Sequence, residues 1–269
     1  MNSKLERLEQ VLSKEIAAPI AVAVSGGVDS MTLAFVAHRV LNAKATMYHA
    51  VSPAVPEAAT ARVRSYAESN GWRLQIISAG EFDDKDYVSN PANRCFYCKT
   101  NLYGSIASLT QASIVSGTNL DDLNDYRPGL KAADDHAVRH PFVEAEIDKA
   151  GVRKIASEYG LNDISALPAA PCLSSRVETG ISIQAPELRF IDKAEQLVRE
   201  RINAESVRCR IRKQGIVIEL DAEVHNELSG RESSEISDAI SQLAARHQVT
   251  GAISFAPYKM GSAFLRMQK

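Results

Sequence analysis

Six consecutive residues, SGGVDS at positions 25–30, carry the small, hydroxyl and acidic side chains best suited to chemistry. Two adjacent glycines let the backbone turn with positive φ and come close to a ligand. The N–H groups of the helix expected to follow favour negative charge, and the hydroxyl groups add donors. The alternative is an ordinary turn between a strand and a helix. We predict an anion site made of Ser25, Gly26, Gly27, Asp29 and Ser30.

A second polar stretch, SGTNLDDLNDYRPG at 116–129, could hold a cation. Mg²⁺ keeps several waters and uses few protein ligands, so one or two carboxylates would suffice. The alternative is a solvated turn capped by Asn or Asp. The carboxylates that could bind Mg²⁺ are those of Asp121, Asp122 and Asp125, and Gly117 and Arg127 lie in the same stretch.

Cysteines form a third set, with Cys95 and Cys98 in RCFYCK and Cys172 in PAAPCLSSR. The C-x-x-C spacing brings two sulfurs close enough to share a metal. Three thiolates complete neither a Cys₄ zinc site nor a four-thiolate cluster, but they would hold a [4Fe–4S] cluster with one iron open. The alternative is that all three are packing residues. Cys209 alternates with arginines in VRCRIR, so we expect it to be buried and do not count it.

These residues require elements that bring them together. The stretch at 21–36 reads as strand, turn and helix. Strands are expected at 45–51, 72–78 and 112–117, with helices at 56–71 and 95–109. Short apolar strands that alternate with helices indicate an α/β fold with a parallel sheet covered on both faces. Ligands bind beyond the carboxyl ends of such strands, where both polar stretches lie.

The pattern changes near residue 170, which we take as a domain boundary. PAAPCLSSRVETG reads as a connecting loop, 185–202 as a helix, and 206–213 and 215–220 as paired strands. The sequence therefore predicts an α/β domain that carries the anion site over 1–170, and a linker followed by a smaller α+β domain over 171–269.

Composition excludes several classes of protein. The chain has 269 residues, of which 45% are hydrophobic and 24% charged, with a net charge of −2 and a pI near 6.3. No basic excess favours a nucleic-acid partner. The amphipathic stretch at 1–16 lacks the apolar core of a signal peptide, and no run is long enough to span a membrane. We expect a cytoplasmic protein.

The SGGVDS motif resembles the pyrophosphate loop of the PP-loop ATP pyrophosphatases. Those enzymes split ATP between its α and β phosphates and adenylate a substrate oxygen. The resemblance implies that the five loop residues hold the pyrophosphate portion of ATP. Gly117, Asp121 and Arg127 follow a strand that ends at the same edge of the sheet, so we also assign them to the ATP site.

The motifs taken in order resemble the LarE family of ATP-dependent sulfur transferases. They are SGGVDS, NPANRCFYCK, SGTNLDDLNDYRPG, PAAPCLSSR and VRCRIRKQGIVIEL. The resemblance implies adenylation of the carboxylates of pyridinium-3,5-biscarboxylic acid mononucleotide and their conversion to thiocarboxylates for the nickel-pincer cofactor of lactate racemase. It also implies a homo-oligomer, since family members form hexamers.

Members of this family supply sulfur in two ways, and Cys172 matches their sulfur-carrying cysteine. In one type that cysteine gives up its own sulfur. In the other, cysteines matching Cys95, Cys98 and Cys172 hold a [4Fe–4S] cluster that takes up sulfide. This sequence has all three cysteines, so the resemblance implies the cluster type and a separate sulfide source.

Further roles follow from the same resemblance. Arg208 and Arg210 match an RxR pair that binds substrate phosphate, Glu219 matches an acidic position, and Arg176 would stabilise the adenylate or steer the substrate. Two other functions stay open at this point. One is tRNA thiolation by a PP-loop enzyme with a [4Fe–4S] cluster, and the other is a non-catalytic adenine-nucleotide sensor.

Overall fold

The computed structural model describes residues 3–124, 128–169 and 171–264. The chain divides into two compact units. The first comprises Met1–Glu81 and Cys95–Ala170, and the second Phe82–Arg94 and Pro171–Lys269. The short segment 82–94, which the sequence boundary at 170 left in the first domain, therefore packs with the second unit.

The first unit contains a four-stranded sheet. Its strands are β1 (Ile20–Ala23), β2 (Ala45–Ala50), β3 (Arg73–Ile77) and β4 (Ser113–Ser116). They lie in the order β3-β2-β1-β4, and every pair is parallel. In the central strand, Ile20 is in register with both Ala45 and Ser113. The α/β fold with a parallel sheet is confirmed.

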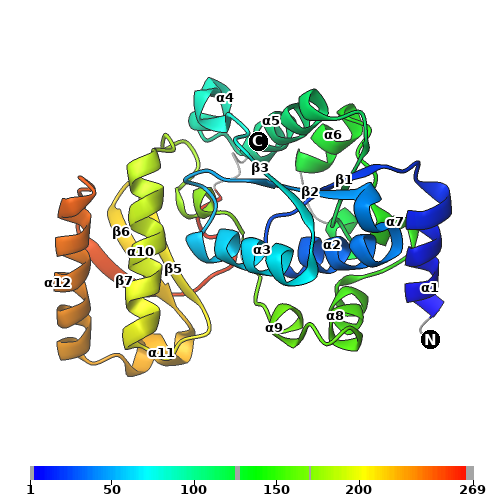
Figure 1. Cartoon of the computed structure of the whole chain (residues 1–269). Coiled ribbons are helices and arrows are strands. Elements are labelled where there is room, and N and C mark those ends of the chain that lie inside the picture. The colour runs from blue at the N-terminus through cyan, green and yellow to red at the C-terminus, as the bar shows by residue number, and fades with distance from the viewer. Residues whose placement is uncertain (1–2, 125–127, 170, 265–269) are drawn as a thin grey trace. The chain divides into compact units, whose positions relative to one another are not determined.

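Helices cover both faces of this sheet (Figure 1). They are α1 (Ser3–Gln10), α2 (Val28–Leu41), α3 (Glu57–Asn70), α5 (Arg94–Leu109), α6 (Pro128–Asp135), α7 (Pro141–Glu144), α8 (Lys149–Glu158) and α9 (Asn162–Ser165). Short helical turns lie at η1 (Val11–Glu15), η2 (Asn42–Lys44) and η4 (Leu120–Asn124).

The residues of β1 point alternately into two cores, as the period of a strand requires. Ile20 and Val22 pack with α1, α2 and α8, whereas Ala21 and Ala23 pack with α5 and α6. A strand buried on both faces is typical of a parallel sheet, which explains its unbroken apolar sequence.

The second unit is built on a three-stranded mixed sheet. It consists of β5 (Val207–Arg212), β6 (Gly215–Leu220) and β7 (Ile253–Pro257) in that order. β5 and β6 form an antiparallel hairpin, and β7 is parallel to β6. The other elements of this unit are η3 (Glu81–Asp83) at its edge, α4 (Lys85–Val88), η5 (Leu173–Arg176), α10 (Ala185–Arg201), α11 (Ala222–Glu227) and α12 (Gly230–Arg246).

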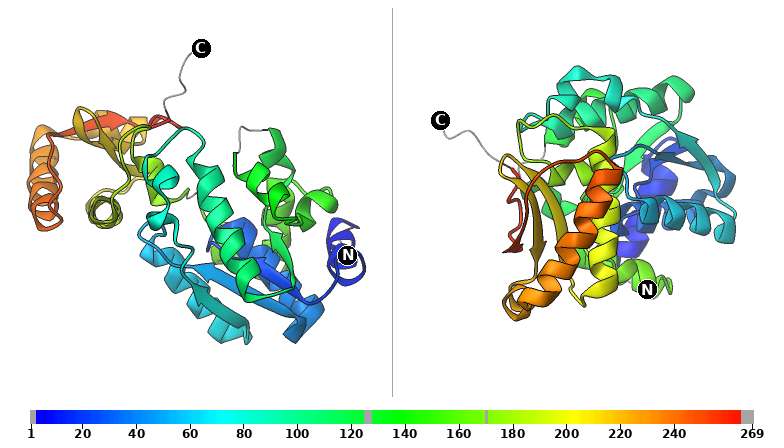
Figure 2. Two further views of the ribbon diagram at one scale, coloured as in Figure 1. Left: turned by 90° about the horizontal axis from the view of Figure 1, so that it is seen from above. Right: turned by 90° about the vertical axis from the view of Figure 1, so that its left-hand side faces the viewer.

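Helices α10 and α12 pack against each other, and they contact β5 and β7 respectively (Figure 2). α12 starts with a capping box in which Ser229 and Glu232 satisfy each other's backbone N–H groups. This arrangement holds the helix that covers the sheet.

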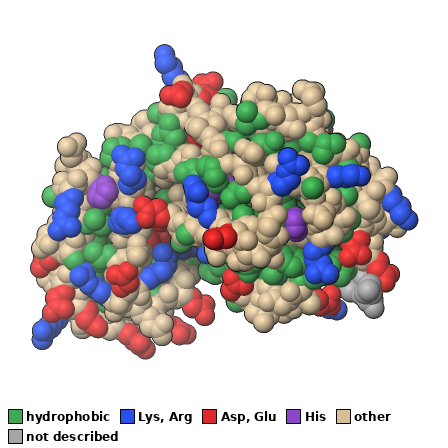
Figure 3. Space-filling view, viewed as in Figure 1, with side chains coloured by type: hydrophobic (Ala, Val, Ile, Leu, Met, Phe, Trp, Pro, Cys, Tyr) green, Lys and Arg blue, Asp and Glu red, His purple; other side chains and the backbone are tan. Residues whose placement is uncertain are grey.

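The helices in the described ranges are all too short or too polar to cross a membrane. Where Figure 3 shows α10 and α12, positive and negative side chains are interspersed.

Candidate functional site

The loop after β1 is held in shape by its own serines. Ser30 Oγ accepts a hydrogen bond from the backbone N–H of Ser25 at 3.0 Å and donates one to Gly27 O at 3.1 Å. The hydroxyl oxygens of Ser25 and Ser30 lie 3.0 Å apart. Gly27 is the N-cap of α2, and the first N–H groups of a helix have no acceptor within it. The loop thus offers donors and partial positive charge to an anion.

Two glycines allow the surrounding backbone to pack closely on this loop. Gly26 has a φ of +84°, and a Cβ there would lie 2.8 Å from the carbonyl oxygen of Ala59 in α3. A Cβ on Gly117, which follows β4, would lie 2.8 Å from both Asp29 C and Ser30 N. The two polar stretches found in the sequence therefore meet at the carboxyl edge of the sheet.

The Asp29 carboxylate is bound by two side chains that the sequence analysis missed. Asn119 Nδ2 donates to Asp29 Oδ1 at 3.1 Å, and Lys149 Nζ lies 2.6 Å from Asp29 Oδ2. On another side of the loop, Arg62 donates to Gly26 O at 2.8 Å. A lone lysine, asparagine or arginine carries no motif, so these neighbours become visible only in the folded chain.

The carboxylates after β4 bind backbone groups. Asp121 Oδ2 accepts from the backbone N–H of Lys149 at 3.0 Å, and Asp122 Oδ2 accepts from that of Asn119 at 3.1 Å. This is the turn-capping role that the sequence left as the alternative to a cation site, and the Mg²⁺ site stays a prediction. Asp125 and Arg127 lie outside the described residues.

The four cysteines differ in accessibility, and none forms a disulfide. Cys95 and Cys98 are partly exposed in the first turns of α5, and Cys172 is partly exposed at the N-cap of η5. Cys209 is fully buried, as expected from its alternation. Burial raises the pKa of the Cys209 thiol well above its ordinary value, and the charge of Glu195 adds to the shift. Cys209 is therefore a packing residue.

The candidate thiolates belong to different units of the chain. Cys95 and Cys98 lie in the first unit and Cys172 in the second. In the described part of the chain, no three His, Cys, Asp or Glu side chains form a group that could hold a metal ion. Cys95 and Cys98 lie one helical turn apart, which suits two ligands of an iron–sulfur cluster. A cluster that also binds the Cys172 thiolate is a proposal and not an observation.

The turn that follows Cys172 is anchored by a buried ion pair. Arg176 donates from Nε to Glu195 Oε1 at 2.9 Å and from Nη2 to Oε2 at 3.2 Å, and each side chain is 3% exposed. Arg176 Nη1 also donates to Cys172 O at 3.2 Å. Burial alone lowers the pKa of Arg176, but the charge and hydrogen bonds of Glu195 outweigh it and the pKa is raised. Arg176 thus holds the backbone of the cysteine it follows.

The strand β5 brings a second buried ion pair to the same turn. Arg210 Nε donates to Glu219 Oε2 at 2.9 Å, and Arg210 Nη1 donates to Ser175 O at 3.0 Å. Glu219 also pairs with Arg212 and accepts from Ser262 Oγ at 2.7 Å. Glu219 is therefore engaged by three neighbours, and Arg210 links β5 to the Cys172 turn.

Arg208, the other arginine of the RxR pair, has a different environment. Its guanidinium donates to Val207 O at 2.8 Å and lies 5.5 Å from the centroid of the Tyr258 ring. Burial and the positive charge of Arg176 lower the pKa of Arg208, and Glu195 offsets them only in part. Arg208 is therefore a buried arginine whose surroundings combine the charges of Arg176 and Glu195.

The segment 84–93, between η3 and α5, also holds the Cys172 turn, and sequence reasoning included only its last four residues, in the motif NPANRCFYCK. Tyr87 Oη lies 2.6 Å from Ser174 Oγ, and both side chains are buried. Asn90 is fully buried with a φ of +54°, and its Nδ2 donates to Glu178 O and Ile181 O at 2.9 Å each. An asparagine before proline signals a turn, but it does not reveal these partners.

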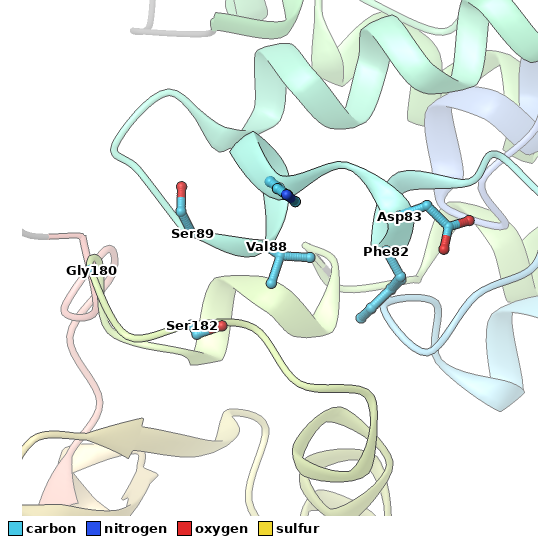
Figure 4. A pocket seen from close by; sticks show the side chains of 7 residues that line it. Phe82, Asp83, Val88, Ser89, Gly180 and Ser182 are labelled. Atoms are coloured by element: carbon cyan, nitrogen blue, oxygen red, sulfur yellow. The ribbon is translucent and has the colours of Figure 1, made fainter.

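A shallow cavity of about 630 Å³ lies beside this segment, within the second unit. Phe82 and Val88 point from the segment toward the loop of Gly180 and Ser182 (Figure 4). None of the residues singled out in the sequence lines this cavity, so it is separate from the site built around Cys172.

Known proteins provide a second test of the sequence interpretation. No protein-family model matches the chain. A Synechocystis protein named uncharacterized protein slr1717 is 37% identical over 227 residues, which is 83% of this chain and 83% of that protein. Uncharacterized protein MJ0830 of Methanocaldococcus jannaschii is 25% identical over 217 residues, 79% and 82% of the two chains.

One relative has a functional name. Pyridinium-3,5-bisthiocarboxylic acid mononucleotide synthase of Lactiplantibacillus plantarum is 29% identical over 206 residues, 75% of this chain and 74% of that protein. Because slr1717 shares more than a third of its residues over most of both chains, the chain belongs to the same family as slr1717, a LarE-like family in which the synthase is a distant homologue.

Proposed function

We propose that the protein is an ATP-dependent sulfur transferase that converts carboxylates of a pyridinium mononucleotide to thiocarboxylates. The observation that carries the proposal is the Ser25–Ser30 loop, which closes on itself at the carboxyl edge of the parallel sheet and starts a helix there. The name of the Lactiplantibacillus relative supports the choice of substrate.

The loop and helix α2 would bind the phosphates of ATP. Gly26 approaches the backbone of α3, and Gly27 leaves space where a side chain would stand. The substrate carboxylate would attack the α-phosphorus, pyrophosphate would leave, and an acyl adenylate would form. A preorganised set of N–H donors stabilises the charge on the departing phosphates.

Sulfur transfer would follow at the Cys172 turn. A sulfur nucleophile attacks the acyl carbon, a C–S bond forms, and the C–O bond to AMP breaks. The RxR pair supports this assignment, because Arg210 reaches the Cys172 turn through Ser175 O and Arg208 lies on the same strand. Arg176 holds the backbone of Cys172 and so positions that residue.

We also propose that Cys95, Cys98 and Cys172 hold a [4Fe–4S] cluster. When bound, such a cluster supplies an open iron that can carry sulfide. The support is the spacing of two accessible thiols on α5 and the exposure of Cys172. The proposal requires the two units to bring their cysteines together, which the anaerobic preparation below tests.

The first experiment measures the reaction. The anaerobically purified chain is incubated with ATP, Mg²⁺, sulfide and pyridinium-3,5-biscarboxylic acid mononucleotide. We expect AMP, pyrophosphate and a thiocarboxylate detected by mass spectrometry, and no AMP when the mononucleotide is omitted. ATP binding without AMP under any of these conditions would contradict the proposal and indicate a nucleotide sensor. AMP formation that depends on tRNA would indicate tRNA thiolation.

The second experiment assigns the cysteines by iron and sulfide quantitation. Cys95→Ala, Cys98→Ala and Cys172→Ala should each lower bound iron, whereas Cys209→Ala, the buried control, should not. Loss of one H₂S from Cys172 in the intact mass after turnover would show that the cysteine gives up its own sulfur, which would overturn the cluster.

A further inference from the structure

We infer that Lys149 is the cation that binds the phosphates of the nucleotide, and that Asp29 acts by holding Lys149 in place. The inference rests on the proposed binding of ATP at the loop. It changes the role of Asp29, which the loop motif alone presents as a direct member of the phosphate site.

The two oxygens of the Asp29 carboxylate are already engaged. Asn119 Nδ2 donates to one at 3.1 Å, and Lys149 Nζ meets the other at 2.6 Å. Asn119 is itself 1% exposed, so it forms a fixed support. A carboxylate repels a phosphate that approaches it directly. Asp29 is therefore better placed to orient a cation than to receive an anion.

Lys149 has the geometry of a phosphate ligand. It is the first residue of α8, and its backbone N–H is fixed by Asp121 Oδ2 at 3.0 Å. An ammonium carries three donors, so one bond to Asp29 leaves two for phosphate oxygens. The side chains of Lys149 and Asp29 are 33% and 26% exposed, which leaves them accessible to a ligand at the start of α2.

The other cation beside the loop has a different task. Arg62 donates to Gly26 O, and it therefore braces the turn from α3. Lys149 contacts the loop through the Asp29 carboxylate. Its ammonium can therefore bind a ligand as well, without any loss of a hydrogen bond to the backbone of the turn. This contrast assigns phosphate binding to Lys149 and support of the loop to Arg62.

The test compares ligands that share or lack a pyrophosphate group. Binding of ATP, pyrophosphate and AMP to the full chain is measured by isothermal titration calorimetry with Mg²⁺ present. Lys149→Gln should weaken ATP and pyrophosphate by about 10- to 100-fold, the loss expected for one charged hydrogen-bond donor, and leave AMP unchanged. Lys149→Arg should restore most of the affinity.

The matched control is Lys154→Gln. Lys154 lies on the same helix, its side chain is 64% exposed, and it pairs with Glu158 at 3.9 Å. This variant should bind all three ligands like the wild type. Thermal unfolding of each variant, followed in parallel, separates loss of binding from loss of folding.

The positioning role of Asp29 is tested by a double-mutant cycle. Asp29→Asn should weaken pyrophosphate binding, and the Asp29→Asn/Lys149→Gln double variant should be no weaker than Lys149→Gln, because both changes remove the same contact. Additive losses would overturn the positioning role. Wild-type pyrophosphate affinity in Lys149→Gln would overturn the inference alone, whereas a wild-type chain that binds neither ATP nor pyrophosphate would overturn the proposed function as well.

Discussion

The Ser25–Ser30 loop and the Cys172 turn use charge in opposite ways. Around the loop, the first N–H groups of α2 have no acceptor within the helix, and the Asp29–Lys149 ion pair is partly exposed. Around the turn, side chains dominate, and the ion pairs of Arg176 with Glu195 and of Arg210 with Glu219 are at most 5% exposed. Backbone N–H donors bury no charge, so they do not need a fixed partner, whereas buried charges must pair to be stable. Substitutions in the turn should thus affect folding, and those in the loop should affect ligand binding first.

The largest effect is expected at the buried carboxylate of the turn. Glu195→Gln leaves the Arg176 guanidinium buried without a counter-charge, so it should lower the free energy of unfolding by about 3–5 kcal/mol. Urea denaturation measures this change. The control is Glu200→Gln on the exposed face of the same helix, where the loss should be below about 1 kcal/mol. Equal losses in the two variants would mean that Arg176 has found another partner.

The features that could be predicted from sequence are those set by neighbouring residues. β2, β3 and β4 lie within a residue of the expected strands, because short apolar runs between glycine and proline report local structure. The glycine loop is also local. Lys149 is 120 residues from Asp29, and Asn119 is 90 residues from it, so no pattern links them.

In the second unit, the partners of the candidate residues could not be predicted from the sequence. Arg208 and Arg210 alternate along a strand, which predicts that they share a face, but only the fold shows that Glu219 pairs with Arg210. The segment 82–94 separates from the first unit although no change of composition marks it. The role of its buried residues Tyr87 and Asn90 is known only from their hydrogen-bond partners, which lie on the Cys172 turn and the loop after it.

An intermediate effect is expected at the glycine of the loop. Gly26→Ala adds a Cβ 2.8 Å from Ala59 O at a φ of +84°, so both strain and a clash should destabilise the first unit, by about 2 kcal/mol or more. The control is Gly80→Ala, where φ is +74° but nothing lies within 4 Å of the added Cβ. It should cost about 1 kcal/mol, from strain alone. Thermal denaturation compares the two variants, and equal losses would show that the loop can move away from α3.

The smallest effect is a pH dependence of stability that differs between the two regions. It involves His49, which contacts the residue before the loop. Its side chain is fully buried, with Nδ1 2.8 Å from Val24 O and Nε2 2.9 Å from Thr60 Oγ1. Burial lowers the pKa of His49, partly offset by its bond to Val24. The neutral ring is therefore favoured in the folded state, and its contribution to stability is complete above the unfolded pKa, near 6.5.

As the pH falls below about 6.5, His49 becomes protonated in the unfolded chain but stays neutral in the folded chain. The free energy of unfolding should then decrease by at most about 1.4 kcal/mol per pH unit for this one group. Burial also lowers the pKa of His140, so its contribution must be removed separately. In the second unit, Glu195 has a lowered pKa because the Arg176 charge outweighs burial, so its contribution is lost only at more acidic pH.

The measurement uses the single tryptophan, Trp72, which is buried in the core of the first unit. Urea unfolding is followed by its fluorescence between pH 5 and 6.5 in the wild type, His49→Asn and His140→Asn. The His49→Asn protein should be less stable throughout but should lose less stability as the pH falls, because the titrating ring is gone. A slope equal to that of the wild type would show that His49 is not the group that titrates. If only His140→Asn flattened the slope, the pH dependence would belong to the end of β4, where His140 Nδ1 lies 2.9 Å from Ser116 Oγ.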